Sequence, residues 1–172
     1  KAAQAHGRAT MRNFRKLAQR PAEVQRSHLF AQLKREAPTA FGRDHGFSSI
    51  RTVEEFRRRM PITNYSYYEP YIERVKNGDV EAMFHDQKIL MFAMTSGTTN
   101  SRKFVPVTRR FLDDYRRGWL LWGLHAFEDH KHLWFKTMVQ LASDWDEFRT
   151  PAGIPCGSIS GFTAQVQKYV VR

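Results

Sequence analysis

An apolar run that passes directly into a hydroxyl-rich segment is the feature that most limits how this chain can fold. Residues 89–94 are continuously apolar over the length of one strand, and residues 104–107 form a second short run with extended character. Between them lies the sequence Thr-Ser-Gly-Thr-Thr-Asn-Ser-Arg-Lys. A continuous apolar run of this length suits a buried strand better than an amphipathic helix. The chain is therefore predicted to contain a strand, a polar loop and a second strand.

The polar loop has the composition of a phosphate-binding loop. Ser96, Thr98 and Thr99 can donate hydroxyl hydrogen bonds to phosphate oxygens, and Gly97 allows the backbone to approach closely. Lys103 follows within a few residues and adds a positive charge. A Walker-type loop is excluded because that motif requires a second glycine immediately before the lysine. Covalent catalysis by Ser96 or Thr99 is disfavoured because no histidine or carboxylate stands nearby in the sequence as an activating base.

Helical patterns fill the N-terminal part of the chain. Residues 11–18 carry apolar side chains at helical spacing, and Pro21 begins a second helix that Pro38 ends. Residues 52–55 form a capping box, and residues 68–75 carry an apolar stripe. We therefore expect a mixed α/β fold with two segments of one larger domain. Residues 1–78 would be mainly helical, and residues 79–172 would be an α/β segment that contains the polar loop.

The second segment contains a further helix and a further predicted strand. Thr108 is expected to cap a long helix that has Trp119 and Trp122 on its apolar side. Residues 132–141 are predicted to form a strand, and residues 41–47 are predicted to be a loop. Residues 150–161 are rich in glycine and proline. His130 and His132 lack further ligands at useful spacing, so we expect a surface turn there and no metal site.

The charge of the chain is concentrated near its N-terminus. The net charge is +11, and residues 1–60 contain 14 Lys and Arg against 5 Asp and Glu, whereas residues 61–172 contain 14 against 12. Basic helices of this kind could contact nucleic acid or an acidic partner, although a solvated helix face is the preferred interpretation. No apolar run approaches the ~18 residues of a membrane helix. We expect a cytoplasmic protein, without a membrane or nucleic acid as its partner.

Several segments together resemble one family. The loop residues Thr95, Ser96, Gly97, Thr98 and Thr99 followed by a lysine resemble the phosphate-binding motif of adenylate-forming enzymes. The segments at residues 41–47, 60–63, 77–79 and 153–161 occur around it in a characteristic order. In this order the chain resembles the N-terminal part of the auxin-responsive acyl acid-amido synthetases of plants and their bacterial relatives. The resemblance covers roughly residues 20–165.

The resemblance implies an ATP-dependent ligase with an adenylate-forming β-sheet core. An acyl acid would be activated by ATP and Mg²⁺ as an acyl-adenylate, and the acyl group would then pass to the amine of an amino acid. Residues 95–99 would bind the nucleotide phosphates, Lys103 would be catalytic, and Trp119 and Trp122 would border the acyl pocket. Core packing is the alternative for the two tryptophans and the preferred one, because an aromatic stripe at helical spacing is usually part of the core. Family members are several times longer, so we expect the chain to be an N-terminal portion that is inactive alone.

Two other functions stay open at this point. An adenylating enzyme could transfer its acyl group to coenzyme A instead of an amino acid. Alternatively, the basic N-terminal helices could belong to a non-catalytic binding module, which would be retained on nucleic acid in a salt-sensitive way. The acyl acid, the acceptor and the oligomeric state do not follow from the residues.

Overall fold

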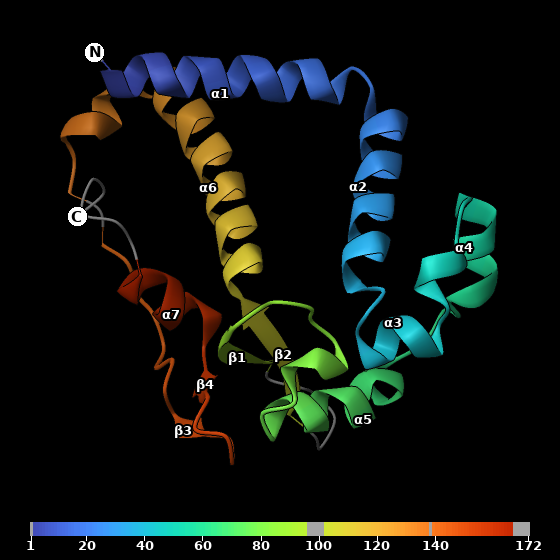
Figure 1. The fold of residues 1–172 in the computed structure, drawn as a ribbon. Coiled ribbons are helices and arrows are strands. Elements are labelled where there is room, and N and C mark those ends of the chain that lie inside the picture. The colour runs from blue at the N-terminus through green and yellow to red at the C-terminus, as the bar shows by residue number, and fades with distance from the viewer. Residues whose placement is uncertain (1, 96–101, 138, 167–172) are drawn as a thin grey trace.

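The computed structural model describes residues 2–95, 102–137 and 139–166, which form a helical part joined to a small sheet (Figure 1). The helices that precede the sheet are α1 (Ala2–Ala18), α2 (Pro21–Glu36), α3 (Ala40–Asp44), α4 (Val53–Arg59) and α5 (Tyr65–Lys76), with short 3₁₀ turns η1 (Phe47–Ser49) and η2 (Val80–Ala82). The predicted capping box is present, because Thr52 and Glu55 bond each other's backbone N–H groups at the start of α4. Together with the sheet, these helices confirm the mixed α/β class.

The described sheet has four strands in the order β2-β1-β4-β3. The strands are β1 (Ile89–Thr95), β2 (Lys103–Thr108), β3 (Phe148–Arg149) and β4 (Pro155–Gly157). The central strand β1 pairs antiparallel with β2 and parallel with β4, while β3 pairs antiparallel with β4. The predicted strand, loop and strand are thus an antiparallel hairpin at one edge of the sheet.

Successive residues of β1 enter two different hydrophobic clusters, as expected for a strand buried on both faces. Phe92 is fully buried in a cluster with Ile72 and Val75 of α5. Met91, also fully buried, packs on the other face with Leu112 of α6 (Arg109–Asp129) and Phe162 of α7 (Ile159–Gln165). The sheet therefore lies between α5 on one side and α6 with α7 on the other.

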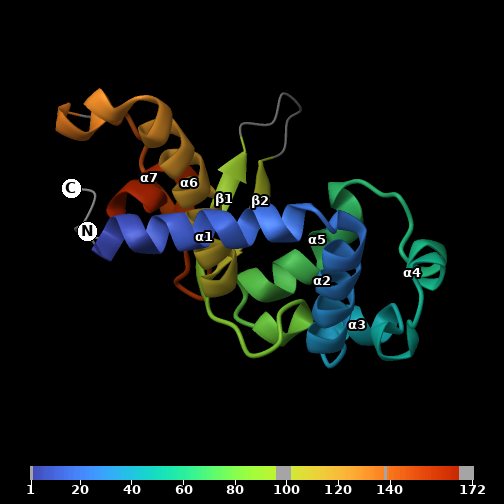
Figure 2. The ribbon, with the colours of Figure 1, turned by 90° about the horizontal axis from the view of Figure 1, so that it is seen from above.

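The long helix α6 begins directly after β2, and its predicted cap is confirmed because the Thr108 side chain accepts a hydrogen bond from the N–H of Phe111 at 3.1 Å. The far end of α6 meets α1, which crosses it and leads on to α2 (Figures 1 and 2). A Cβ atom on Gly7 of α1 would lie 2.6 Å from the Leu124 side chain of α6, so a glycine permits this close approach.

Two sequence-based predictions are wrong. Residues 41–47 are not simply a loop, because α3 begins at Ala40 and η1 follows it. Thr39 caps α3 by accepting a hydrogen bond from the N–H of Gly42, and this contact stabilises a helix too short to show a periodic apolar pattern.

Residues 132–141 contain no strand within their described part. They include most of the 3₁₀ turn η3 (Lys131–Phe135), followed by irregular backbone. Val139 and Leu141 are 85% and 91% exposed, and neither pairs with a neighbouring strand. Apolar sequence alone did not produce a strand here because a strand also needs a partner for its backbone hydrogen bonds. Within the described ranges, no helix is both long enough and apolar enough to cross a membrane.

Candidate functional site

The β1–β2 hairpin brings together the two ends of the predicted phosphate-binding loop. Thr95 is the last residue of β1 and pairs directly with Lys103, the first residue of β2. Both side chains are exposed, and a directly opposed pair projects from the same face of a sheet. The predicted phosphate-binding residues Ser96, Gly97, Thr98 and Thr99 lie outside the described residues. The structure therefore defines the base of the loop, with one hydroxyl and one ammonium side by side.

The Lys103 ammonium makes no hydrogen bond or ion pair with another described residue, and its side chain is exposed. The neighbouring Arg102 instead lies 3.9 Å from a carboxylate oxygen of Glu147. A flexible ammonium group without an anionic partner can serve as a point charge for a phosphate. The local arrangement is thus suited to the anion-binding role predicted for Lys103.

Phe104, the residue after Lys103, is held by α5. The N–H of Phe104 donates to the hydroxyl of Tyr65 at 2.9 Å, and that hydroxyl donates to the Phe104 carbonyl at 3.3 Å. The ammonium nitrogen of Lys76 lies 4.3 Å from the centroid of the Phe104 ring. Sequence reasoning did not identify this role of Tyr65, because the two residues lie 39 positions apart and only the folded chain brings them together.

The two predicted substrate residues lie on an exposed aromatic stripe of α6. The rings of Phe111, Tyr115, Trp119 and Trp122 follow one another, with centroid separations of 6.0, 6.2 and 5.2 Å. Trp119 is 54% exposed and Trp122 is 64% exposed, whereas the neighbouring Leu112 is 1% exposed and packs on the sheet. The described contacts therefore do not make these tryptophans part of the core, and their rings are available to contact an apolar group.

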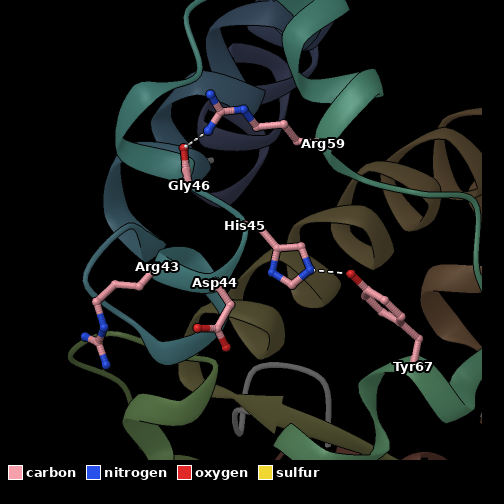
Figure 3. Close-up of a pocket in the computed structure, with 6 residues that line it drawn as sticks. All are labelled: Arg43, Asp44, His45, Gly46, Arg59 and Tyr67. Atoms are coloured by element: carbon pink, nitrogen blue, oxygen red, sulfur yellow. Dashed lines mark hydrogen bonds between the residues drawn. The ribbon is translucent and has the colours of Figure 1, made fainter.

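A polar hollow of about 440 Å³ lies elsewhere, between α3, α4 and α5 (Figure 3). Its lining residues are Arg43, Asp44, His45, Gly46, Arg59 and Tyr67. The His45 ring bonds the Phe41 carbonyl at 2.7 Å through Nδ1 and the Tyr67 hydroxyl through Nε2. Arg59 donates to the Gly46 carbonyl at 3.0 Å. Because these groups bond one another across the three helices, the hollow is a structural junction.

The same junction contains a tyrosine with an altered pKa. Tyr71 of α5 donates its hydroxyl hydrogen bond to Asp44 at 2.7 Å, and this bond raises the pKa of Tyr71 to about 12. The ordinary pKa of tyrosine is about 10. The folded state therefore favours the neutral phenol, and the resulting stabilisation is fully present below about pH 10 and lost as the pH rises towards 12.

Replacing Tyr71 with phenylalanine is expected to remove this alkaline sensitivity. The free energy of unfolding of the parent protein should exceed that of Tyr71→Phe at pH 8, and the difference should shrink between pH 10 and pH 12 because the phenolate cannot donate to Asp44. Urea unfolding of both proteins across this range measures the difference. A difference that stays constant up to pH 12 would show that the Tyr71–Asp44 bond does not set the pKa.

No group of three His, Cys, Asp or Glu side chains within the described part of the chain could hold a metal ion. His130 and His132 stack edge to face, with 6.0 Å between ring centroids, next to η3. Cys156 is fully buried in β4, and burial raises the pKa of its thiol. A buried thiol with a raised pKa is a poor nucleophile and a poor metal ligand.

The sequence is similar to curated plant ligases. Indole-3-acetic acid-amido synthetase GH3.5 of Arabidopsis thaliana is 31% identical over 143 residues, which are 77% of this chain and 22% of that protein. Indole-3-acetic acid-amido synthetase GH3.6 of the same plant is 33% identical with the same coverage. Jasmonoyl-L-amino acid synthetase GH3.3 of Oryza sativa subsp. japonica is 27% identical over 97 residues, which are 56% of this chain and 21% of that protein. The chain thus spans 22% of the length of the two Arabidopsis relatives.

The fold is similar to that of a solved structure, the acyl acid amido synthetase AtGH3.15 in complex with 2,4-DB. The superposition has a TM-score of 0.81 and covers 94% of this chain and 29% of that chain, at 21% sequence identity. The GH3 family N-terminal domain matches residues 10–172, which is nearly the whole sequence. The chain therefore belongs to the GH3 family.

Proposed function

We propose that the full-length protein is an ATP-dependent ligase that joins an acyl acid to the amine of an amino acid. The observation that carries the proposal is the Thr95–Lys103 pair in a chain of the GH3 family. It places a hydroxyl, and an ammonium that has no partner among the described residues, at the base of a hydroxyl-rich loop. The relatives named above are acid-amido or amino acid synthetases, which supports the class of reaction. We also propose a cytoplasmic location, where ATP and amino acids are both available.

The proposed reaction has two steps. In the first, a carboxylate oxygen of the acyl acid attacks the α-phosphorus of ATP, and the bond between the α-phosphorus and the α,β-bridging oxygen breaks, so that pyrophosphate leaves with the bonding electrons. In the second, the amine attacks the acyl carbon, an amide forms, AMP leaves with the bonding electrons, and the amine loses a proton. Lys103 would stabilise the negative charge that accumulates on the departing pyrophosphate, together with Thr95 and the loop residues Ser96, Gly97, Thr98 and Thr99.

Magnesium is proposed to enter the site with the nucleotide. Mg²⁺ commonly binds through substrate phosphates and one or two carboxylates. It would neutralise charge on the triphosphate. Trp119 and Trp122 would border the acyl group, since their exposed rings offer an apolar surface on the helix that follows β2.

The function is tested with full-length protein, ATP, Mg²⁺ and a panel of aromatic and aliphatic carboxylic acids. We expect pyrophosphate release that requires a carboxylic acid, followed by an amide product that requires an amino acid, both measured by mass spectrometry and a coupled pyrophosphate assay. A thioester formed only with coenzyme A would instead support an acyl-CoA synthetase. Absence of acid-dependent pyrophosphate release, combined with salt-sensitive retention on DNA, would support a basic binding module and contradict the ligase.

A further inference from the structure

The strand β2 lies at the edge of the described sheet, where no described strand neighbours the backbone groups on its outer side. Phe104 pairs with Met94 of β1, yet both its N–H and its C=O meet the hydroxyl of Tyr65, at 2.9 and 3.3 Å. Both backbone groups of Phe104 therefore point away from β1. A single hydroxyl, which accepts from the N–H and donates to the C=O, replaces the missing strand at this residue.

The side chain of Phe104 is fixed as well as its backbone. Its ring packs edge to face against Phe92 and Phe148, with centroid separations of 6.3 and 6.1 Å, and Lys76 covers it at 4.3 Å. Tyr65 packs against the cluster that contains Phe92, and burial raises the pKa of its hydroxyl. The hydroxyl therefore keeps its proton at neutral pH, which it needs in order to donate to the Phe104 carbonyl.

We propose that Tyr65 is a positioning residue for Lys103, and this inference rests on the function proposed above. Lys103 is joined by one peptide bond to the N–H that Tyr65 holds, so the hydroxyl restrains the backbone from which the lysine side chain projects. Restraining that backbone before substrate binds reduces the entropy lost on reaching the transition state. Tyr65 touches neither substrate nor the reacting atoms in this role, and it acts only through Lys103.

The variant Tyr65→Phe removes the hydroxyl and keeps the ring. In full-length protein we expect the kcat of acid-dependent pyrophosphate formation to fall about tenfold, with the KM for the acyl acid unchanged, because the loss affects the charge that develops in the transition state. Tyr68→Phe is the matched control, since Tyr68 lies on the same helix and its hydroxyl forms no hydrogen bond within the described residues. An equal loss of kcat in both variants would overturn the proposal.

A double-mutant cycle tests whether Tyr65 acts through Lys103. In a Lys103→Ala background, Tyr65→Phe should cause little further loss, because the group that it positions is already missing. The same tenfold loss in both backgrounds would mean that Tyr65 acts on the fold generally, and it would overturn the positioning role.

Amide hydrogen exchange gives a readout that does not depend on catalysis. The Phe104 amide should exchange about tenfold faster in Tyr65→Phe than in Tyr68→Phe, because its hydrogen-bond acceptor is lost. Faster exchange in a protein that adenylates no acid would refute the ligase and the role of Tyr65 in catalysis, while the backbone anchor would stand. Unchanged exchange in an active enzyme would refute the anchor itself and leave the ligase function intact.

Discussion

Replacing Lys103 with alanine in the full-length protein is expected to slow acid-dependent pyrophosphate exchange by about a hundredfold or more. The departing pyrophosphate gains negative charge in the transition state, and the Lys103 ammonium is free of other described partners and can stabilise that charge. The effect should appear in kcat more than in the KM for the acyl acid. Lys103 would stabilise charge that forms on pyrophosphate only in the transition state, and this charge is absent when the acid binds. Isotopic exchange between ATP and pyrophosphate measures this step.

Lys88→Ala is the matched control for this prediction. Lys88 is an exposed lysine directly before β1, and Ile89 pairs with Thr108 at the end of the hairpin opposite to Lys103. Removing the same charge there should leave the exchange rate near that of the parent protein. Both variants should unfold at the parent temperature because both side chains are exposed. An unchanged exchange rate in Lys103→Ala would show that another group supports the pyrophosphate and would contradict the loop assignment.

The sequence predicted those parts of the fold that depend on local chemistry. The apolar run at residues 89–94 became the central strand, and Thr52 and Thr108 formed the helix caps expected of them. Each of these features is decided by residues that are close in the chain. The local sequence was therefore sufficient to predict this strand and the starts of these two helices.

The features that the sequence did not reveal depend on distant parts of the chain. The strand predicted at residues 132–141 is absent from their described part, where no described strand offers a partner for its backbone. The bonds between Tyr65 and Phe104 join residues on a helix and an edge strand, and no spacing rule connects them. For the candidate site, the phosphate-binding roles of the loop and Lys103 stay predictions from local sequence. The hydrogen bonds that hold Phe104, the residue after Lys103, became visible only in the folded chain.

The exposed stripe on α6 illustrates the same limit for substrate residues. Trp119 was expected on the apolar side of the helix, and it is 54% exposed, whereas Leu112 of the same helix is buried against the sheet. An apolar stripe at helical spacing shows that a helix has an apolar face, but it does not show what covers that face. The proposed contact between this stripe and an acyl group is therefore inferred from the proposed ligase reaction. It does not follow from the apolar pattern of the helix.

The largest expected effect on stability comes from replacing Gly42 with alanine. A Cβ atom at this position of α3 would lie 2.0 Å from the carbonyl oxygen of Glu36, at the C-terminal end of α2. The other nearest atoms are also backbone atoms, the Glu36 carbonyl carbon at 2.9 Å and the Ala37 Cα at 3.0 Å. Because no flexible side chain can move aside, α2 and α3 would have to separate.

That separation would disturb several contacts together. The Glu36 carbonyl accepts a hydrogen bond from the Thr39 hydroxyl at 2.7 Å, and the same hydroxyl caps α3 through the Gly42 N–H. Phe41, the neighbouring residue, packs with Leu33 of α2 in the cluster that joins these helices. We therefore expect Gly42→Ala to lower the free energy of unfolding by about 3 kcal/mol, measured by urea denaturation.

Gly118→Ala is the matched control, because it makes the same substitution in a place with room for the methyl group. No atom lies within 4 Å of a Cβ at Gly118, which lies inside α6. There the alanine should raise the free energy of unfolding by about 0.5–1 kcal/mol, since glycine loses more backbone entropy in a helix. The two variants should therefore change stability in opposite directions. A loss of the same size in both would mean that the effect reflects alanine in a helix, and not the contact between the backbones of α2 and α3.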